Sequence, residues 1–227
     1  SALGWRFINP EMAQVDEGNA TVSLGETAER VAELSGISRQ RSDAFAVRSH
    51  ERAVAAQEQG DFDSEIIPVM TEGGTVKIDE GPRTDSSPEA MGALAPVFRS
   101  NGIVTAGSAS PLSDGAAAVV VASRKAVERW GLTPVAVVRG SASAGVAPSL
   151  MGLGPVAATE RLLNRVGFTM DQIDVMEINE AFAPQVLACL DRLGVDEERV
   201  NLCGGAIALG HPLGASGTRL TLTAVRQ

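Results

Sequence analysis

The sequence is most constrained over residues 201–217, NLCGGAIALGHPLGASG, where a dense run of glycines surrounds His211. Each glycine allows a positive φ or leaves room for a ligand against bare main chain. The glycines are Gly204, Gly205, Gly210, Gly214 and Gly217. The small apolar residues 206–209 predict a buried strand, Pro212 stiffens the bend after His211, and residues 214–217 predict the opening of a helix.

The chain has only two histidines, and their settings differ. We expect the strand and bend to deliver His211 to the floor of a pocket, where an imidazole is a candidate base or hydrogen-bond donor near neutral pH. On spacing alone, a satisfied structural histidine is the alternative. His50 lies between Ser49 and Glu51 on the charged flank of a predicted helix, and we expect it to be solvated.

Size and charge exclude several classes of protein. A chain of 227 residues with 44% hydrophobic content suffices for one large domain or parts of two. Its longest apolar runs are well short of the about 18 residues that a membrane helix needs. The opening residues SALGWRFINP lack the regions of a signal peptide, so we expect no membrane partner and a cytoplasmic location. The net charge of −9 disfavours nucleic acid but allows a local basic pocket.

The two cysteines, Cys189 and Cys203, are too few for a disulfide framework and are not spaced for a zinc site. We expect no metal site. Cys189 lies in the apolar stretch VLACL, which is typical of a buried structural thiol. No basic neighbour in the sequence lowers the pKa of Cys203. Neither cysteine is therefore interpreted as a nucleophile.

The first part of the chain predicts a loop and then helices. Residues 1–20 have no sustained periodicity and are expected to form a loop. Apolar residues spaced along one helical face then predict a helix from about residue 24 that Gly36 ends, and a longer helix capped by Ser38 that Gly60 ends. Further helices are expected at 124–130 before Gly131, at 155–166 before Gly167, and at 180–193.

Short apolar runs between these helices predict strands, at residues 65–70, 116–122, from 135 onward, and 174–178. The 116–122 run, AAAVVVA, is expected to be a buried strand. Because strands and helices alternate along the chain, the predicted fold class is α/β, with layers of helix and sheet.

Two strings resemble motifs of the thiolase family. GGAIALGHPLGASG at 204–217 is similar to the family's histidine motif, and NEAFA at 179–183 is similar to its asparagine motif, in the expected order and spacing. The resemblance implies a layered αβαβα architecture that is incomplete here. It divides the chain into the remainder of the covering loop domain (1–112), the last piece of the N-terminal core domain (113–134) and most of the C-terminal core domain (135–227).

The resemblance also implies roles for particular residues. His211 would activate the nucleophile and donate a hydrogen bond to the thioester oxygen, and Asn179 would hold the water that completes the oxyanion hole; a plain helix cap is the local alternative for Asn179. The family's coenzyme A contacts match Ala106, Ser110, Met151 and Arg83. Ser108 departs from the usual Asn, and a solvated surface residue is the alternative for Arg83.

The implied reaction is acyl transfer to or from CoA through an acyl-cysteine: thiolytic cleavage of a 3-oxoacyl-CoA or condensation of acetyl-CoA, as in fatty acid metabolism. CoA and acyl-CoA would be substrates, with no permanently bound cofactor, and a homodimer or homotetramer is implied. The family's nucleophile motif and its CxGxG motif are both missing, so the chain alone is expected to be inactive.

Three rival interpretations belong to other classes. The missing motifs also fit a catalytically incomplete fragment or a nonenzymatic thiolase-like subunit. A nucleotide-binding module is disfavoured because residues 210–217 have neither GxGxxG spacing nor a following Lys-Ser/Thr pair. The strings NEAF and GGAIALGHP favour thiolase over the related ketosynthases.

Overall fold

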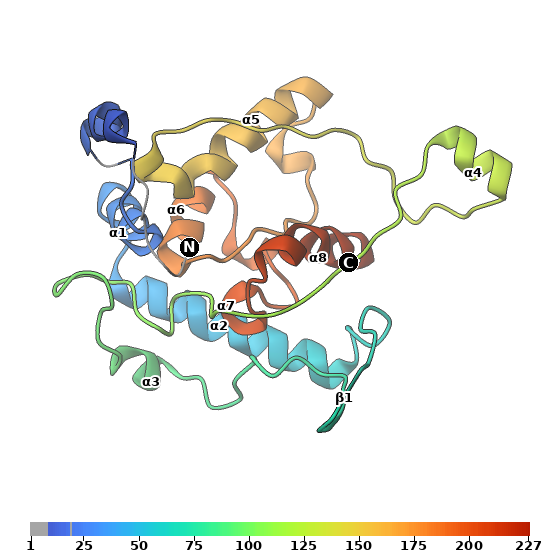
Figure 1. Cartoon of the computed structure of the whole chain (residues 1–227), viewed down its shortest axis with the longest axis horizontal. Coiled ribbons are helices and arrows are strands. Elements are labelled where there is room, and N and C mark those ends of the chain that lie inside the picture. The colour runs from blue at the N-terminus through green and yellow to red at the C-terminus, as the bar shows by residue number, and fades with distance from the viewer. Residues whose placement is uncertain (1–8, 19) are drawn as a thin grey trace.

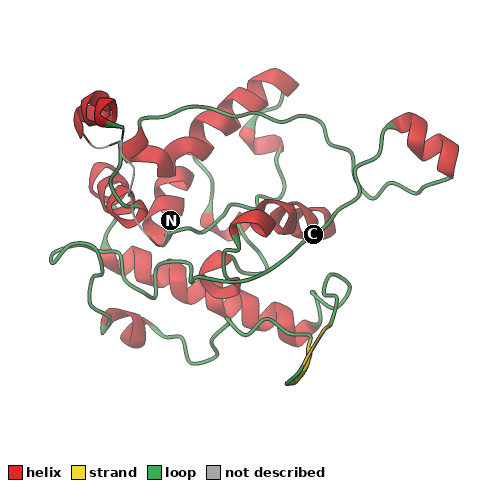
Figure 2. Cartoon of the chain, in the orientation of Figure 1, coloured by secondary structure: helices red, strands yellow, loops and turns green. Residues whose placement is uncertain are grey.

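Helices and long loops make up nearly all of the computed structural model, which describes residues 9–18 and 20–227 (Figures 1 and 2). The helices with α geometry are α1 (Leu24–Ser35), α2 (Arg39–Gln59), α3 (Pro88–Gly92), α4 (Arg124–Trp130), α5 (Gly154–Val166), α6 (Ala183–Leu193), α7 (Ala206–Leu209) and α8 (Leu213–Arg226). The 3₁₀ helices are η1 (Pro10–Gly18), η2 (Pro148–Leu153), η3 (Met170–Gln172) and η4 (Glu197–Arg199). Strands β1 (Val69–Thr71) and β2 (Gly74–Val76) form an antiparallel hairpin.

The predicted helix boundaries are confirmed in the first half of the chain. The Ser38 hydroxyl accepts a hydrogen bond from the backbone N–H of Arg41, as an N-cap should. Gly36 and Gly60 end α1 and α2 in the left-handed conformation, with φ of 66° and 76°. The loop predicted over 1–20 falls partly on residues 1–8 and 19, outside the described residues, and is wrong for Pro10–Gly18, which forms η1.

Helix α6 lies at the centre of the core, packed against α1, α2 and η2 (Figure 1). Its residues from Ala183 to Leu190 are all buried, including Gln185, whose amide donates to the carbonyl of Gly152. The helix begins three residues later than predicted because residues 181–183 bond to a loop instead. In that loop, Ser110 N–H donates to the carbonyl of Ala181, and Ala183 N–H donates to the carbonyl of Ser108.

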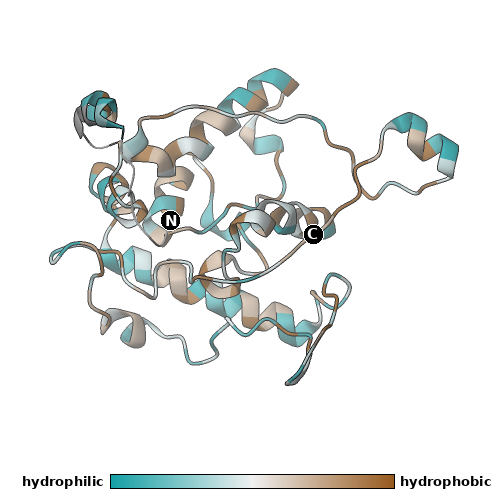
Figure 3. Ribbon diagram, viewed as in Figure 1, coloured by the Kyte–Doolittle hydropathy of each residue, from teal (hydrophilic) through white to brown (hydrophobic). Residues whose placement is uncertain are grey.

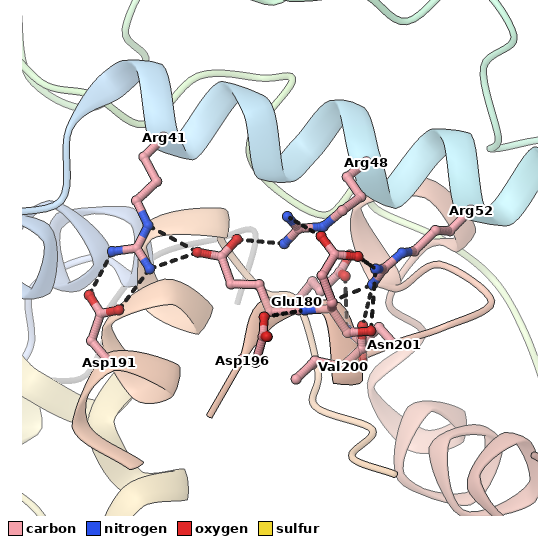
Figure 4. Close-up of polar contacts among 10 residues, drawn as sticks. Arg41, Arg48, Arg52, Glu180, Asp191, Asp196, Val200 and Asn201 are labelled. Atoms are coloured by element: carbon pink, nitrogen blue, oxygen red, sulfur yellow. Dashed lines mark hydrogen bonds and ion pairs between the residues drawn. The ribbon is translucent and has the colours of Figure 1, made fainter. Parts of the chain in front are cut away.

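Arginines on one side of α2 join this helix to the end of α6 and to the segment that follows it (Figure 4). The bonds connect Arg41 to Asp191 and Glu197, Arg48 to Glu197, and Arg52 to the carbonyl oxygen of Val200. Several are bidentate or shared, a geometry that makes charge-assisted bonds stronger and more specific. The network fixes α2 beside residues 191–200, directly before the glycine-rich run.

Several predicted strands do not form. Residues 116–122 and 135–138 are extended and exposed, with Val120 92% and Val135 87% accessible, so the prediction of a buried strand at 116–122 is wrong here (Figure 3). An extended segment becomes a strand only where neighbouring backbone completes its hydrogen bonds. Among the described residues, 174–178 finds such a neighbour only through one parallel bridge, Met176 to Val200.

Two other strand predictions are corrected. The strand expected over 65–70 is instead the exposed hairpin strand Val69–Thr71. The buried strand expected over 206–209 is the short helix α7, because Leu209 and Gly210 N–H groups bond back to the carbonyls of Gly205 and Ala206. No helix in the described ranges is long and apolar enough to cross a bilayer.

Candidate active site

His211 and Asn179 meet at the centre of the candidate site. Asn179 lies in the extended segment before α6, and His211 lies between α7 and α8. The Asn179 Nδ2 atom is 3.4 Å from His211 Nε2. Both side chains are half-buried, so the two predicted catalytic residues share one site that is open to a ligand.

The other ring nitrogen fixes the tautomer of His211. Nδ1 lies 2.6 Å from the Ser216 hydroxyl oxygen, and that hydroxyl donates to the carbonyl of Pro212 at 3.1 Å. With the hydroxyl proton on the Pro212 carbonyl, Nδ1 carries the proton that it shares with Ser216, and the Asn179 amide at Nε2 favours the same tautomer. Nε2 is therefore the unprotonated nitrogen, and it accepts from the Asn179 amide.

Burial lowers the pKa of His211, and the positive charge of Arg219 lowers it further. Both effects disfavour the imidazolium form. At neutral pH the ring is neutral, with the lone pair of Nε2 facing the Asn179 amide. A neutral imidazole of this kind can accept a proton from a thiol or from a carbon acid.

The Asn179 amide has an unused acceptor. Its Oδ1 atom is buried and accepts no hydrogen bond from the described residues. A buried amide oxygen without a donor is costly, so a small polar ligand at this position would be stabilised.

Sequence reasoning missed the residues that hold Asn179. Asn201, in the left-handed conformation with φ of 51°, pairs its amide with both backbone groups of Ile178, at 2.8 and 2.9 Å. Glu180, the next residue after Asn179, is fully buried. The signals were present as a second asparagine at the head of the glycine run and an acidic residue within an apolar motif.

The loop predicted to line the CoA arm runs beside the site. Ser110 bonds through its N–H to the carbonyl of Ala181, two residues after Asn179. Farther along, Gly115 lies so close to Pro212 that an added Cβ would be 2.6 Å from the proline ring. Ala106 is exposed at the start of this loop. Small residues are therefore required where the loop passes the His211 turn.

The remaining two predicted CoA contacts lie on other elements. Met151 is 45% exposed on η2, between α1 and α6. Arg83 has an exposed side chain, and its backbone N–H donates to His50 Nδ1 at 3.2 Å. Among the described residues, His211 forms its hydrogen bonds with Asn179 and Ser216 and with neither of these two.

His50 is buried, with only 5% exposed, so the expectation that it is solvated is wrong. The loop containing Arg83 covers it: Gln57 on α2 bonds to the carbonyl of Asp79, and Gly81 packs on the carbonyl of Ala208. Burial, followed by the charge of Arg83, lowers the pKa of His50.

The glycines of the run have separate structural reasons. Gly204 and Gly210 adopt positive φ values of 79° and 90°. Gly205 packs directly against the Glu180 carboxylate, where no Cβ would fit. Room for a ligand does not explain these three positions. Gly214 and Gly217, in α8, are exposed and have no atom within 4 Å of an added Cβ.

Neither cysteine is activated. Cys189 is fully buried, its Sγ donates to the carbonyl of Gly152, and burial raises its pKa to about 11. Burial likewise raises the pKa of Cys203, and the carboxylates of Asp61, Glu177 and Glu65 add to the rise. Because the thiolate is the nucleophilic form, both thiols are poor nucleophiles at neutral pH.

The model of the thiolase N-terminal domain matches residues 10–125, just over half of the chain, and the model of the C-terminal domain matches residues 132–227. The chain therefore belongs to the thiolase family. It is 53% identical to the beta-ketoadipyl-CoA thiolase of Pseudomonas aeruginosa, over all of this chain and 57% of that protein. It is 48% identical to the 3-oxoadipyl-CoA/3-oxo-5,6-dehydrosuberyl-CoA thiolase of Escherichia coli, over 99% of this chain and 57% of that protein.

Solved structures agree with the sequence match. The crystal structure of human mitochondrial 3-ketoacyl-CoA thiolase in complex with CoA superposes with a TM-score of 0.89 at 41% identity, over 95% of this chain and 54% of that chain. The backbone therefore follows the same course as in the solved thiolase, even where its extended segments have no neighbouring strand to bond to. The chain spans little more than half the length of the relatives it matches.

Proposed function

We propose that this chain supplies the base and the oxyanion-binding residues of a thiolase that transfers acyl groups to and from CoA through an acyl-cysteine. The observation that carries the proposal is the chain of hydrogen bonds from Asn179 through His211 to Ser216, which leaves Nε2 unprotonated. A protein of the relatives' length that contains this chain is called the full-length protein below.

His211 Nε2 performs two roles in turn. It first accepts the proton of the attacking thiol, which gives the thiolate that adds to the thioester or 3-oxo carbonyl. The nitrogen then carries a proton and can donate a hydrogen bond to the oxygen that becomes negative. Ser216 holds the ring in position throughout, because its bond is made to the other nitrogen.

Asn179 acts on the same oxygen through a water. Its buried Oδ1 accepts one proton of that water, and the second proton then points to the developing oxyanion. The loop with Ala106 and Ser110 lies along the arm of CoA, Met151 approaches the acyl group, and Arg83 contacts the phosphate or adenine end.

The nucleophile belongs to sequence outside residues 1–227. Cys189 and Cys203 both have raised pKa values, and Cys189 is sealed in the core. The same observation favours the alternative, a catalytically incomplete fragment or a nonenzymatic thiolase-like subunit, if no such cysteine reaches the site.

The substrate class follows the relatives' names. Several relatives are called beta-ketoadipyl-CoA or 3-oxoadipyl-CoA thiolases, so a 3-oxoacyl-CoA with a free carboxylate at the far end of its acyl chain is the proposed substrate. A cytoplasmic location, a homodimer or homotetramer, and the domain division 1–112, 113–134 and 135–227 belong to the same proposal. Light scattering of the full-length protein tests the assembly.

Steady-state thiolysis tests the function. The 227-residue chain alone should not cleave 3-oxoadipyl-CoA or acetoacetyl-CoA, whereas the full-length protein should cleave the first with the higher kcat/KM. In the full-length protein, His211→Ala or Asn179→Ala should lower kcat by roughly a hundredfold or more and leave KM nearly unchanged. The reason is that the lost hydrogen bonds are made in the transition state. Full activity in either variant would remove the proposal's basis.

A further inference from the structure

Glu180 has a carboxylate that is 1% exposed and that the catalytic account above does not use. Hydrogen bonds reach it from three separate segments of the chain (Figure 4 draws Glu180 with Asn201). The donors are the Ser49 hydroxyl at 2.7 Å, the Asn201 amide at 2.8 Å and the Ile207 backbone N–H at 3.0 Å. Burying a carboxylate this completely costs free energy unless hydrogen bonds compensate for the lost water. The three donors supply those bonds to Glu180.

Every proton in this cluster has one acceptor. The Asn201 amide donates one proton to Glu180 and the other to the carbonyl of Ile178. The Ser49 hydroxyl donates to Glu180 and accepts from the N–H of Gly205. All three hydrogen-bond partners of Glu180 are donors, an arrangement that suits a carboxylate that only accepts. Burial raises the pKa of Glu180, and these three bonds oppose that rise.

The cluster binds both catalytic segments to one helix. Ser49 lies on α2, which the arginine bonds already hold in place. Asn201 bonds to both backbone groups of Ile178, which directly precedes Asn179. Glu180 directly follows Asn179. Ile207 lies in α7, four residues before His211. The two catalytic residues, otherwise joined by one 3.4 Å contact, thus share a common anchor.

We propose that Glu180 is a positioning residue that holds the Asn179 amide against His211 Nε2 and so keeps that nitrogen free of a proton. Its consequence for catalysis rests on the proposed function, but its effect on His211 does not. The carboxylate reaches the substrate only through Asn179 and His211.

Glutamine is the informative substitution at this position. If its oxygen takes the side that faces Ser49 and Ile207, its NH₂ group faces the Asn201 amide, and two donors oppose each other. Asn201 must then turn away and release Ile178, which moves Asn179. Glu180→Gln therefore keeps the volume of the side chain while it breaks the anchor.

The test is nitrogen-15 NMR of the imidazole rings in the 227-residue chain. Its two histidines are distinguishable, because His50 accepts a bond at Nδ1 and so carries its proton on Nε2, opposite to His211. A His50→Gln variant completes the assignment. In Glu180→Gln the ratio of the Nδ1–H to the Nε2–H tautomer of His211 should fall by about tenfold, the loss of one neutral hydrogen bond. The titration midpoint of His211 should also rise.

Glu29→Gln is the matched control. Glu29 is 3% exposed and accepts bonds from the backbone N–H groups of Ile103 and Val104, so its loss also disturbs a buried, fully bonded carboxylate. These bonds hold residues 103 and 104 and reach none of Ser49, Asn201 or Ile207, so the spectrum of His211 should not change. An unchanged His211 spectrum in both variants, with similar losses of stability, would make Glu180 merely structural and overturn the proposal.

Ser49→Ala covers the case in which Glu180→Gln fails to fold. It removes one donor to Glu180 and should shift the His211 tautomer ratio in the same direction by a smaller factor; no shift would contradict the proposal.

In the full-length protein, Glu180→Gln should lower kcat about tenfold with KM within about twofold. An NMR shift without thiolysis in the unmutated protein would refute the proposed function alone, and thiolysis without an NMR shift would refute the positioning role alone.

Discussion

Gly205→Ala is the sharpest test of packing at the site. Gly205 has φ of −131° and ψ of −164°, an extended conformation that alanine adopts freely. The effect must therefore come from the added methyl group, which would overlap the Glu180 carboxylate. Either Glu180 moves and loses a donor, or Gly205 moves and its N–H loses the Ser49 hydroxyl.

The structure gives the size of the effect. Overpacking a tight site costs about 1–3 kcal/mol, and the loss of one hydrogen bond to a charged group adds about 1.5–3 kcal/mol. We therefore expect Gly205→Ala to lower the free energy of unfolding by about 2.5–6 kcal/mol, a large part of the stability of an ordinary domain.

Urea denaturation followed by circular dichroism measures this loss, with Gly217→Ala as the control. Gly217 lies inside α8 with no atom near its added Cβ, so alanine there should raise stability by up to about 1 kcal/mol through helix propensity. A loss below about 1 kcal/mol for Gly205→Ala, or equal effects of the two changes, would refute the contact between Gly205 and Glu180.

Two further predictions concern titration and thiol access. Burial raises the pKa of Glu177 to about 7 from 4.5, so the unfolded state loses its proton first and stability falls as pH rises from 4.5 to 7. Glu177→Gln should recover up to about 3 kcal/mol in urea melts at pH 8 and much less at pH 5; equal effects at both would contradict the shift. Iodoacetamide at pH 8 should label the half-buried Cys203 in the native chain and Cys189 only after unfolding, which peptide mapping would detect. Native labelling of Cys189 would contradict its burial.

Helices α1 and α2 could be predicted from local signals because each carries its own start and stop. Ser38 and Gly60 bound α2 through bonds made within a few residues, and no distant segment is needed to form them. The 116–122 strand failed for the opposite reason. Its apolar residues favour a strand, but a strand needs a neighbour, and the described residues provide none there.

The sequence predicted the two candidate catalytic residues, because both lie in motif strings. His211 and Asn179 follow from those strings, and the structure adds their contact. Glu180 lies in the same string as Asn179, but its role could not be predicted from that string, because its partner Ser49 lies 131 positions away in sequence. His50 was misjudged for a similar reason, since the loop that buries it follows more than 30 residues later.

The measurement that tests the central claim most directly is the location of the acyl group on the full-length protein. Incubation with acetoacetyl-CoA, rapid acid quenching and peptide mass spectrometry would identify the acylated residue. The account predicts an acetyl thioester on a cysteine outside residues 1–227, which His211→Ala strongly reduces. An acetyl group on Cys203 or Cys189, abolished by the corresponding Cys→Ser change, would contradict it.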